Sequence, residues 1–398
     1  MQPKYLLSDV DLGEEEAQAV AEVVRSKWLS VGPRTAEFEA RFAEMTGSRH
    51  AVAVANCTAA LHLALEALHV GPGDEVLVPS YTFVASANAI LYQSATPVFV
   101  DIAGPHDLNL APADLERKIT PRSRAIIVVH LAGFPADMDA ILDIAARHSL
   151  PVVEDACHAI GADFHGGPGS KLAGRKAGAL GRIGCFSFFA NKNLVTGEGG
   201  MLVADDDELA GRMRLGRSHG MTKTSWDKAD GRATDYDVVQ LGHNFRGTEL
   251  TAALGLIQLR KLPAANARRR ELVAAYRQRL REVSGVSLPF VHRLEDSAHH
   301  IFPILLDDAA MRNAFREALR ERGIQTSVHY PPVHQFTHHR AIVGEVRLPA
   351  TEEVSAREVT LPLHPLLSVE DVGVICDAVA ESLASLRSKV ERGKPGRI

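Results

Sequence analysis

Between residues 51 and 204, short apolar runs alternate with longer segments whose apolar residues recur at helical spacing. This alternation constrains the fold more than any other feature, because strands buried on both faces read as continuous apolar runs and parallel strands are joined by helices. It predicts an α/β domain in which helices flank a mainly parallel, seven-stranded sheet. The expected strands are 51–55, 75–78, 96–100, 125–130, 152–154, 184–188 and 201–204, and the expected helices are 59–68, 83–92, 112–118, 138–148, 207–218 and 248–259.

The alternation loosens near Pro263, where a new helix rich in arginine and glutamate is expected at 264–282. A smaller α+β domain should follow, with a strand at 301–306, a helix at 309–322, a short extended piece at 325–329 and a closing helix at 369–386. We therefore divide the chain into a large domain that includes the N-terminal segment, a small C-terminal domain, and a tail in which glycine, proline and charge replace apolar periodicity. Their expected bounds are 1–262, 263–390 and 391–398.

Composition argues against several classes of protein. With 398 residues, 46% hydrophobic and 23% charged, the chain can fill a core and is neither disordered nor a disulfide-stapled miniprotein. The formal charge of -5 and the lack of a long basic run argue against nucleic acid as a partner. The four cysteines lie far apart and read as reduced thiols, and no apolar run is long enough for a membrane span or a signal peptide. We therefore expect a cytoplasmic protein.

The ends of three predicted strands carry polar residues, although no dinucleotide fingerprint or P-loop accompanies the sheet. The strand at 152–154 leads directly to Asp155. The strand at 184–188 carries Ser187 and is followed by Lys192, and the strand at 51–55 runs through Thr58 into a helix. Because open parallel sheets bind ligands at the carboxyl ends of their strands, these side chains form a candidate site.

Their chemistry together suits pyridoxal phosphate. An amine that condenses with an aldehyde must lose its proton, which partial burial of Lys192 would favour. A carboxylate at Asp155 would keep the pyridine nitrogen protonated, so that the ring accepts electrons. The helix that opens after Thr58 offers free N–H groups to a phosphate, and the Thr58 and Ser187 hydroxyls add hydrogen bonds. Each residue alone also has an ordinary explanation: an N-cap for Thr58, a cap or ion pair for Asp155, and a solvated charge for Lys192.

Longer stretches of the chain resemble a known family. From about residue 28 to about residue 386, the chain is similar to the DegT/DnrJ/StrS sugar aminotransferases, which are fold-type I, aspartate aminotransferase-like enzymes that use pyridoxal 5′-phosphate. The resemblance implies that fold, that cofactor and transaminase activity. The matching stretches are GPRTAEFEARFAEMTG, HAVAVANCTAALHLAL, GPGDEVLVPSYTFVASANAI, ATPVFVDI, VVEDACHAIGA, GCFSFFANKNLVTGEGG, LGHNFRGTELTAALGLIQL, HYPPVH and LPLHP.

The resemblance also implies a role for each matching residue. Lys192 would form the Schiff base with the cofactor and carry the proton during catalysis, and Asp155 would pair with the pyridine nitrogen. A homodimer with shared active sites is implied as well, because one of the contacts reaches the neighbouring subunit. The other cofactor contacts would be Phe83 on the ring face, His158 near the phenolic oxygen, Ser187, Thr58 and the Ala59 amide at the phosphate, and Asn244 at the phosphate of the neighbouring subunit.

Substrate contacts follow from the same resemblance. The acceptor opening would be bordered by Trp28, Arg246, His329, Tyr330 and His334, with a solvated surface charge an equally good explanation for Arg246. No metal site is expected, since the histidine pairs at 299–300 and 338–339 lack a third ligand at zinc-like spacing.

Two departures from the family pattern fall near the expected pocket. The chain reads Asn56-Cys57-Thr58 where Ser-Gly-Thr is usual, so a larger side chain occupies the turn toward the phosphate. The connection at 165–180 is longer than usual and would alter the entrance to the pocket.

Lys192 also bears on the type of reaction. Relatives that remove a sugar hydroxyl carry histidine at this position, so the lysine favours transamination. The expected reaction moves an amino group from L-glutamate or L-glutamine to a nucleotide-linked keto sugar or a keto-cyclitol, for glycan or antibiotic amino-sugar biosynthesis. Two alternatives stay open: different carbanion chemistry on the same fold, such as dehydration, and a noncatalytic sensor.

Overall fold

The computed structural model describes residues 3–223, 226–227, 231, 234–291 and 294–393. Its central element is a seven-stranded sheet of order β1-β11-β10-β7-β6-β2-β3. Neighbours from β10 to β3 are parallel, and β11 is antiparallel to both β1 and β10. The predicted α/β class with a mainly parallel sheet of seven strands is therefore confirmed. The strands are β1 (His50–Val54), β2 (Glu75–Pro79), β3 (Thr96–Val100), β6 (Ser123–Val129), β7 (Val152–Asp155), β10 (Ile183–Ser187) and β11 (Gly200–Ala204).

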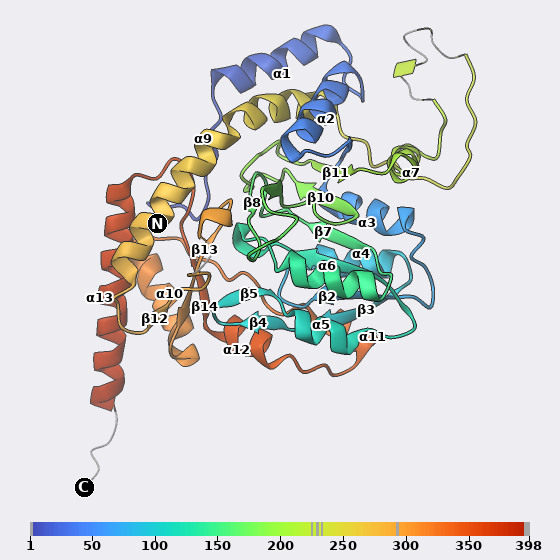
Figure 1. The fold of residues 1–398 in the computed structure, drawn as a ribbon. Coiled ribbons are helices and arrows are strands. Elements are labelled where there is room, and N and C mark those ends of the chain that lie inside the picture. The colour runs from blue at the N-terminus through green and yellow to red at the C-terminus, as the bar shows by residue number, and fades with distance from the viewer. Residues whose placement is uncertain (1–2, 224–225, 228–230, 232–233, 292–293, 394–398) are drawn as a thin grey trace.

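Helices cover both faces of this sheet (Figure 1). Because successive side chains of a strand point to opposite faces, Val52 and Val54 pack on one side, whereas Ala51 and Ala53 pack on the other. The first face is covered by α3 (Cys57–Ala67), α4 (Ala85–Tyr92) and α7 (Asp207–Arg217). The second face is covered by α2 (Pro33–Thr46), α5 (Pro112–Lys118), α6 (Met138–Arg147) and the first part of α9 (Glu249–Leu280).

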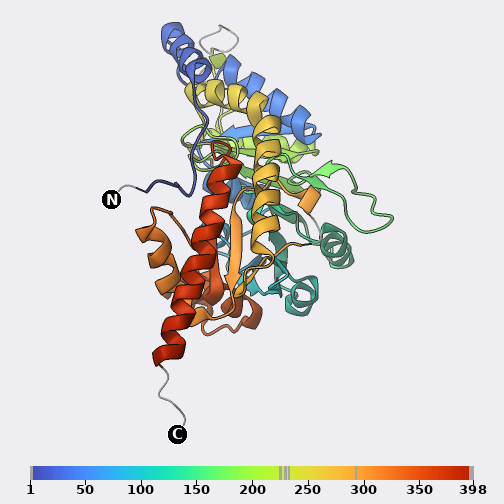
Figure 2. The same ribbon diagram turned by 90° about the vertical axis from the view of Figure 1, so that its left-hand side faces the viewer.

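The helix α9 corrects one expectation, because it runs without interruption through Pro263. The sequence predicted two helices there, since proline lacks the N–H that an interior helical position donates. In the structure the first part of α9 packs against α1 (Glu14–Ser26) and α2, and its last part packs against α13 (Val369–Gly393) (Figures 1 and 2). Packing at both ends offsets the helix-breaking tendency of proline, which is about 3 kcal/mol.

The C-terminal part has its own core around a three-stranded antiparallel sheet. Leu272 and Tyr276 of α9 pack there against Phe302 and Ile304. Tyr5 is buried in the same core, and its backbone N–H donates to the carbonyl of Gly323 at 2.9 Å. The elements are β12 (Val286–Ser287), β13 (Phe302–Leu306), β14 (Glu358–Leu361), α10 (Arg312–Glu321), α11 (Thr337–Val343), α12 (Pro349–Arg357) and α13.

The division at 262/263 stays a prediction, and the structure adds two facts that bear on it. The long helix α9 crosses that boundary, and the N-terminal segment reaches the C-terminal core through Tyr5. Of the predicted tail, residues 391–393 belong to α13, and 394–398 lie outside the described residues.

Smaller elements complete the fold. Among the described residues, no helix has the length and apolarity needed to cross a bilayer. Two short hairpins pair β4 (Ile102–Gly104) with β5 (Asp107–Leu110) and β8 (Asp163–Phe164) with β9 (Arg175–Lys176), and the 3-10 helices are Leu131–Gly133, Leu294–Asp296, Ala309–Met311 and Val333–Gln335.

Candidate active site

A cavity of about 450 Å³ lies at the carboxyl ends of β7 and β10. Asp155 ends β7 and Ser187 ends β10, and these two strands are parallel neighbours in which Cys185 is opposite Asp155. Parallel pairing therefore brings both side chains to one edge of the sheet. The residues expected in the site that line the cavity are Thr58, Phe83, Asp155, His158, Ser187, Lys192, His329 and Tyr330.

The start of α3 forms a second wall. Asn56 is its N-cap, with extended backbone, and the Oδ1 of Asn56 accepts a hydrogen bond from the Ala59 N–H at 2.9 Å. The Thr58 hydroxyl-bearing side chain lines the cavity, whereas Ala59 does not. Gly200 of β11 allows this arrangement, because a Cβ at that position would lie 2.6 Å from the carbonyl carbon of Asn56. The positive end of the helix dipole therefore points at the same space as the Thr58 side chain.

Asp155 is buried, and its carboxylate is held by two donors. The Ser86 hydroxyl on α4 donates to Oδ2 at 2.7 Å, and the backbone N–H of Cys157 donates to Oδ1 at 3.2 Å. Hydrogen bonds to an ionised acceptor are stronger than neutral ones, so both orient the carboxylate firmly at the cavity wall. Ser86 is a contact that the sequence did not single out.

Lys192 has the properties expected of a reactive amine. Burial lowers its pKa, against the opposing attraction of the Asp155 carboxylate. Its Nζ lies 3.5 Å from Nε2 of His300, and Nδ1 of His300 is 3.0 Å from the Asn193 amide oxygen. The lowered pKa favours the unprotonated amine of Lys192, and Asn193 holds the ring of His300 beside that amine.

His300 was visible in the sequence only as half of a histidine pair, which we expected to be structural. Its position next to Lys192 results from tertiary structure, because 108 residues separate the two. Burial, followed by the charges of His158 and Lys192, lowers the pKa of His300 well below its usual value. The ring is therefore neutral near pH 7.

Two buried polar atoms in the cavity wall have no partner among the described residues. They are Nδ1 of His158 and Oδ1 of Asn191. The other ring nitrogen of His158 is 2.9 Å from the Tyr330 hydroxyl, and burial lowers the pKa of His158 well below its usual value. Buried polar atoms are almost always satisfied, so these two point to a polar ligand.

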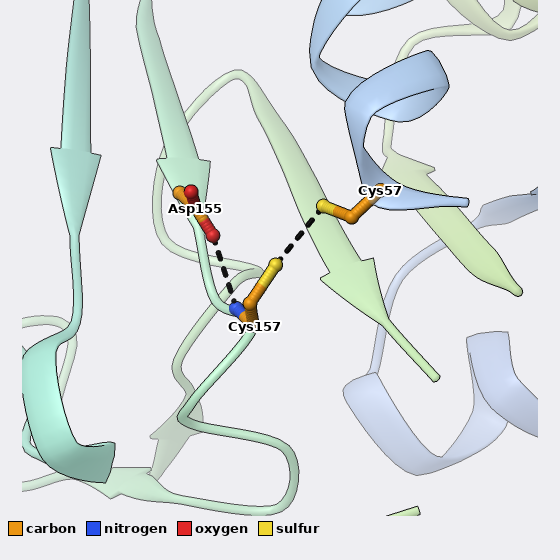
Figure 3. Close-up of side chains that lie close together, drawn as sticks. All are labelled: Cys57, Asp155 and Cys157. Atoms are coloured by element: carbon orange, nitrogen blue, oxygen red, sulfur yellow. Dashed lines mark hydrogen bonds between the residues drawn. The ribbon is translucent and has the colours of Figure 1, made fainter. Parts of the chain in front are cut away.

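The thiols of Cys57 and Cys157 lie 3.0 Å apart beside Asp155, as Figure 3 shows. Cys57 opens α3 and Cys157 follows two residues after Asp155, so the pair forms only when α3 is placed over β7. Burial raises the pKa of Cys57 to about 11 and that of Cys157 well above its usual range. Both are therefore protonated thiols at neutral pH. From the sequence we identified Cys57 as a departure from the family pattern but did not predict its contact with Cys157.

Other residues expected in the site lie outside the cavity. Asn244 is exposed and pairs through its backbone with Ser218, and the half-buried Arg246 pairs with Val54 in the same way. The Trp28 indole N–H donates to the Val31 carbonyl at 3.1 Å.

His334 is buried, with one ring nitrogen 2.7 Å from the Ser80 hydroxyl and the other 3.3 Å from a Glu352 carboxylate oxygen. Both of its ring nitrogens are thus engaged inside the protein.

The long connection at 165–180 does not contribute to the wall of the cavity. None of its residues is among the described residues that line the cavity. Its end is anchored by the buried Glu154, whose carboxylate accepts the backbone N–H groups of Gly178, Leu180 and Gly181 at 2.8, 2.7 and 2.5 Å. The expected effect on the entrance is not supported by this placement.

Several lining residues were not predicted. Asn191 and Glu198 flank Lys192 in a stretch that the sequence did single out, so their nearness to the lysine was the available signal. Thr82 and Leu61 carried no such signal, since neither has chemistry that points to a cofactor. The full cavity wall adds Asn56, Cys57, Leu61, Thr82, Ala85, Val129, Cys157, Phe189, Asn191 and Glu198 to the predicted residues.

The donor set fits pyridoxal 5′-phosphate. A carboxylate (Asp155), the amine of a half-buried lysine (Lys192), two hydroxyls (Thr58 and Ser187) and a helix N-terminus share one cavity. His158 and Asn191, which each have one buried polar atom without a partner among the described residues, line the same cavity. These are the groups that a pyridinium, an aldehyde and a phosphate require.

Known proteins resemble this chain over nearly its whole length. The model of the DegT/DnrJ/EryC1/StrS aminotransferase family matches residues 10–380. The spore coat polysaccharide biosynthesis protein SpsC of Bacillus subtilis strain 168 is 41% identical over 377 residues, which cover 93% of this chain and 95% of that protein.

Solved structures show the same fold. The PLP form of the putative sugar aminotransferase Spr1654 from Streptococcus pneumoniae is 30% identical, with a TM-score of 0.88 over 96% of this chain and 98% of that chain. DesI in the presence of its TDP-sugar product is 32% identical, with a TM-score of 0.85 over 98% of this chain and 96% of that chain. The chain therefore belongs to the DegT/DnrJ/EryC1/StrS aminotransferase family, whose members are pyridoxal phosphate-dependent sugar aminotransferases of the type I fold.

Proposed function

We propose that this enzyme transfers an amino group from L-glutamate or L-glutamine to the ketone of a nucleotide-linked sugar or a cyclitol, for glycan or antibiotic amino-sugar biosynthesis. The observation that carries the proposal is the half-buried Lys192, whose amine shares a cavity with Asp155 and whose pKa is lowered by burial. Relatives support the class of acceptor: SpsC is named for polysaccharide biosynthesis, and DesI has a TDP-sugar product.

Each residue of the cavity has a proposed task. When bound, pyridoxal phosphate supplies an aldehyde for the incoming amine and a ring that takes up electrons. Asp155, held by Ser86, would face the pyridine nitrogen, and the Thr58 and Ser187 hydroxyls would bind the phosphate. Burial lowers the pKa of Lys192, which favours the neutral amine, and Nζ would move a proton to and from the α-carbon of the substrate.

The substrate side of the cavity is aromatic. Phe83 is 58% exposed although it lines the cavity, and its ring centroid lies 6.1 Å from that of Tyr330. We assign Phe83 to the face of the cofactor ring, and we assign His329 and Tyr330 to the border of the acceptor. Trp28, Arg246 and His334 do not line the cavity of this chain, so their expected contacts with the acceptor stay a prediction.

A homodimer is part of the proposal, because the segment before α9 has exposed apolar residues. Described residues 234–248 make up this segment, which extends away from the body in Figure 1, and Leu241 is 83% exposed, with Val238 and Val239 at 55% each. Asn244, expected at the phosphate of the neighbouring subunit, is exposed on the same segment. Burying such side chains against a second copy would remove apolar surface from water.

Next to this segment is a second depression of the surface. This open hollow of about 620 Å³ is lined by Asn56, Thr58, Ala59, His62, Tyr92 and Phe245. Thr58 lines both the hollow and the cavity, so a neighbouring subunit seated here would reach the phosphate end of the cofactor site. We also place the enzyme in the cytoplasm, where a reducing environment would keep the adjacent Cys57 and Cys157 as thiols.

The test uses Lys192→Ala, with Lys176→Ala as the matched control, since Lys176 pairs with Asp163 outside the cavity. The Lys192 variant should lose turnover and the visible absorption of the bound cofactor, and borohydride should attach a pyridoxyl group to Lys192 in the wild type. Normal turnover by Lys192→Ala, or a tag on another residue, would refute the assignment.

The reaction itself is tested in two halves. L-glutamate or L-glutamine alone should convert the bound cofactor to its amine form, and one member of a panel of keto nucleotide-sugars and keto-cyclitols should restore the aldehyde spectrum. A cofactor that binds but does not exchange with either amino acid would instead favour dehydration, and a protein that binds no cofactor would favour a sensor.

A further inference from the structure

Outside the cavity, a second group of side chains brings metal-ligating atoms together. His62 and Glu66 lie one turn apart on α3, and His243 lies on the segment that precedes α9. One ligand atom from each of the three lies within 4.8 Å of the other two. Residues four apart share a face of a helix, so α3 presents an imidazole and a carboxylate side by side toward His243.

We propose that His62, Glu66 and His243 bind a divalent transition-metal ion of the zinc class. Two imidazoles and one carboxylate are the three protein ligands of many open zinc sites, in which the fourth position holds water or an anionic oxygen. Zn–N and Zn–O bonds of about 2.0–2.2 Å in a tetrahedron separate ligand atoms by about 3.3–3.6 Å. The present upper limit of 4.8 Å on the spacing of the three ligand atoms is therefore wider than a bound ion requires, and the side chains would have to close on the ion.

The backbone around His243 is already fixed. Its N–H donates to the Gly216 carbonyl at 2.7 Å, and its carbonyl accepts from the His219 N–H at 2.8 Å. The ring stacks on Phe245 with centroids 4.5 Å apart and planes 8° from parallel. A site whose ligands are held by rigid elements loses little conformational freedom when the ion binds.

Within this group, the imidazole of His62 has no hydrogen-bond partner among the described residues. Nε2 of His243 is 3.0 Å from a Glu66 carboxylate oxygen, and that pair alone would be a satisfied surface contact. The ring of His62 lies 4.7 Å from that of His243, centroid to centroid, yet makes no hydrogen bond to any residue that the structure describes.

The hollow described above provides the fourth coordination position. His62 lines it together with Thr58, and in the single chain it is open on one side, so water or an oxygen atom of a neighbouring subunit seated there would complete the coordination. An ion held here would tie the segment with Asn244 and Arg246 to the helix that begins at the cofactor cavity. All three ligands come from one chain, so the site does not depend on the proposed dimer.

The experiment titrates Zn²⁺ by calorimetry into cofactor-loaded enzyme that has been stripped with a chelator. Wild type should bind one ion per chain tightly. His243→Phe should keep the stack on Phe245 but weaken binding by at least about 100-fold, since even outer-shell changes cost 10- to 100-fold. Glu66→Gln, which preserves the hydrogen bond to His243, should weaken binding in the same direction. His148→Gln, at an exposed histidine after α6, is the matched control and should bind as wild type does.

A competing site has to be separated in the same experiment. Cys57, Asp155 and Cys157 also bring ligand atoms within 4.8 Å of one another in the cavity (Figure 3). If tight binding survives His243→Phe and Glu66→Gln but disappears in Cys157→Ala, the ion is in the cavity and the proposal is overturned. Wild type that binds no ion tightly overturns it as well. An anomalous scattering peak between His62, Glu66 and His243 in crystals soaked with Zn²⁺ would support it independently of how well any variant folds.

Discussion

Replacing Glu154 by glutamine should lower the free energy of unfolding by about 2–4 kcal/mol, because one buried carboxylate serves four donors. Its Oε1 accepts from the Leu180 and Gly181 N–H groups, and its Oε2 accepts from Gly178 N–H and from His130 Nε2 at 2.7 Å. The side chains of Glu154 and His130 are both fully buried. Glutamine keeps one oxygen, so the bonds at the former Oε2 are the ones at risk.

His130 cannot adapt without a cost. Its Nδ1 accepts the Ala136 N–H at 3.1 Å, so the ring proton sits on Nε2 and points at Glu154. If an amide NH₂ replaces Oε2, the Nε2–H of His130 faces another donor and loses its acceptor. If the ring proton moves to Nδ1 instead, the Ala136 N–H loses its acceptor. Together with the Gly178 N–H, two buried donors lose their acceptor at about 1–3 kcal/mol each, less what water recovers. Glu154→Ala removes all four bonds and should cost about twice as much.

The assay is urea unfolding followed by circular dichroism, supported by thermal melting. The matched control is Glu44→Gln, because among the described residues the Glu44 side chain forms an exposed ion pair with Arg41 alone; the change should alter stability by less than about 0.5 kcal/mol. The reasoning fails if Glu154→Gln is as stable as Glu44→Gln. It also fails if alanine at 154 costs no more than glutamine.

Two further predictions concern groups with shifted pKa values. Burial raises the pKa of Glu358 to about 8, above the unfolded value near 4.3. The stability that the protonated Glu358 contributes is therefore full at low pH and is lost as pH rises from about 4.5 to 8. Glu358→Gln should flatten the fall of Tm over this range, and parallel wild-type and variant curves would contradict the prediction. Because the thiolate is the nucleophile and the pKa of Cys57 is about 11, iodoacetamide should label Cys57 slowly at pH 7 and about tenfold faster per pH unit up to pH 10. Bound cofactor should block the labelling of Cys57 but not that of Cys376, which is buried in the C-terminal core and serves as the control thiol outside the cavity. Labelling of each cysteine is measured by mass spectrometry of the peptides. Fast labelling of Cys57 at pH 7, or labelling that bound cofactor does not slow, would contradict the prediction.

The sheet and the cavity residues on it could be predicted because their signals are local. A buried strand is a run of apolar residues, and Asp155 and Ser187 close two such runs, so parallel pairing was enough to bring them together. Lys192 and Thr58 follow their strands within a few residues. Contacts between residues that are far apart in the sequence have no local pattern from which they could be predicted. Glu154 reads as one more residue of a strand, and only the folded chain shows that it anchors the backbone of 178–181.

The helix α9 shows the opposite limit, where a strong local signal is overridden. Pro263 is a reliable helix breaker in isolation, but packing against α1 and α2 at one end and α13 at the other stabilises a continuous helix. Tyr5 was likewise assigned by its place in the chain to the large domain, whereas its ring is buried in the C-terminal core. Both results depend on the final arrangement of elements that are far apart in sequence.

Cys57 illustrates how a departure from a family pattern is accommodated by residues elsewhere. A side chain larger than glycine at this turn would be expected to crowd the phosphate end of the cavity. In the structure the thiol instead contacts Cys157, and Gly200 on the adjacent strand leaves room for the backbone of Asn56. The Thr58 side chain still lines the cavity, and Asn56 still caps α3. Since Gly200 and Cys157 together provide the space, Gly200→Ala should disturb the turn at Asn56 more than Cys57→Gly does.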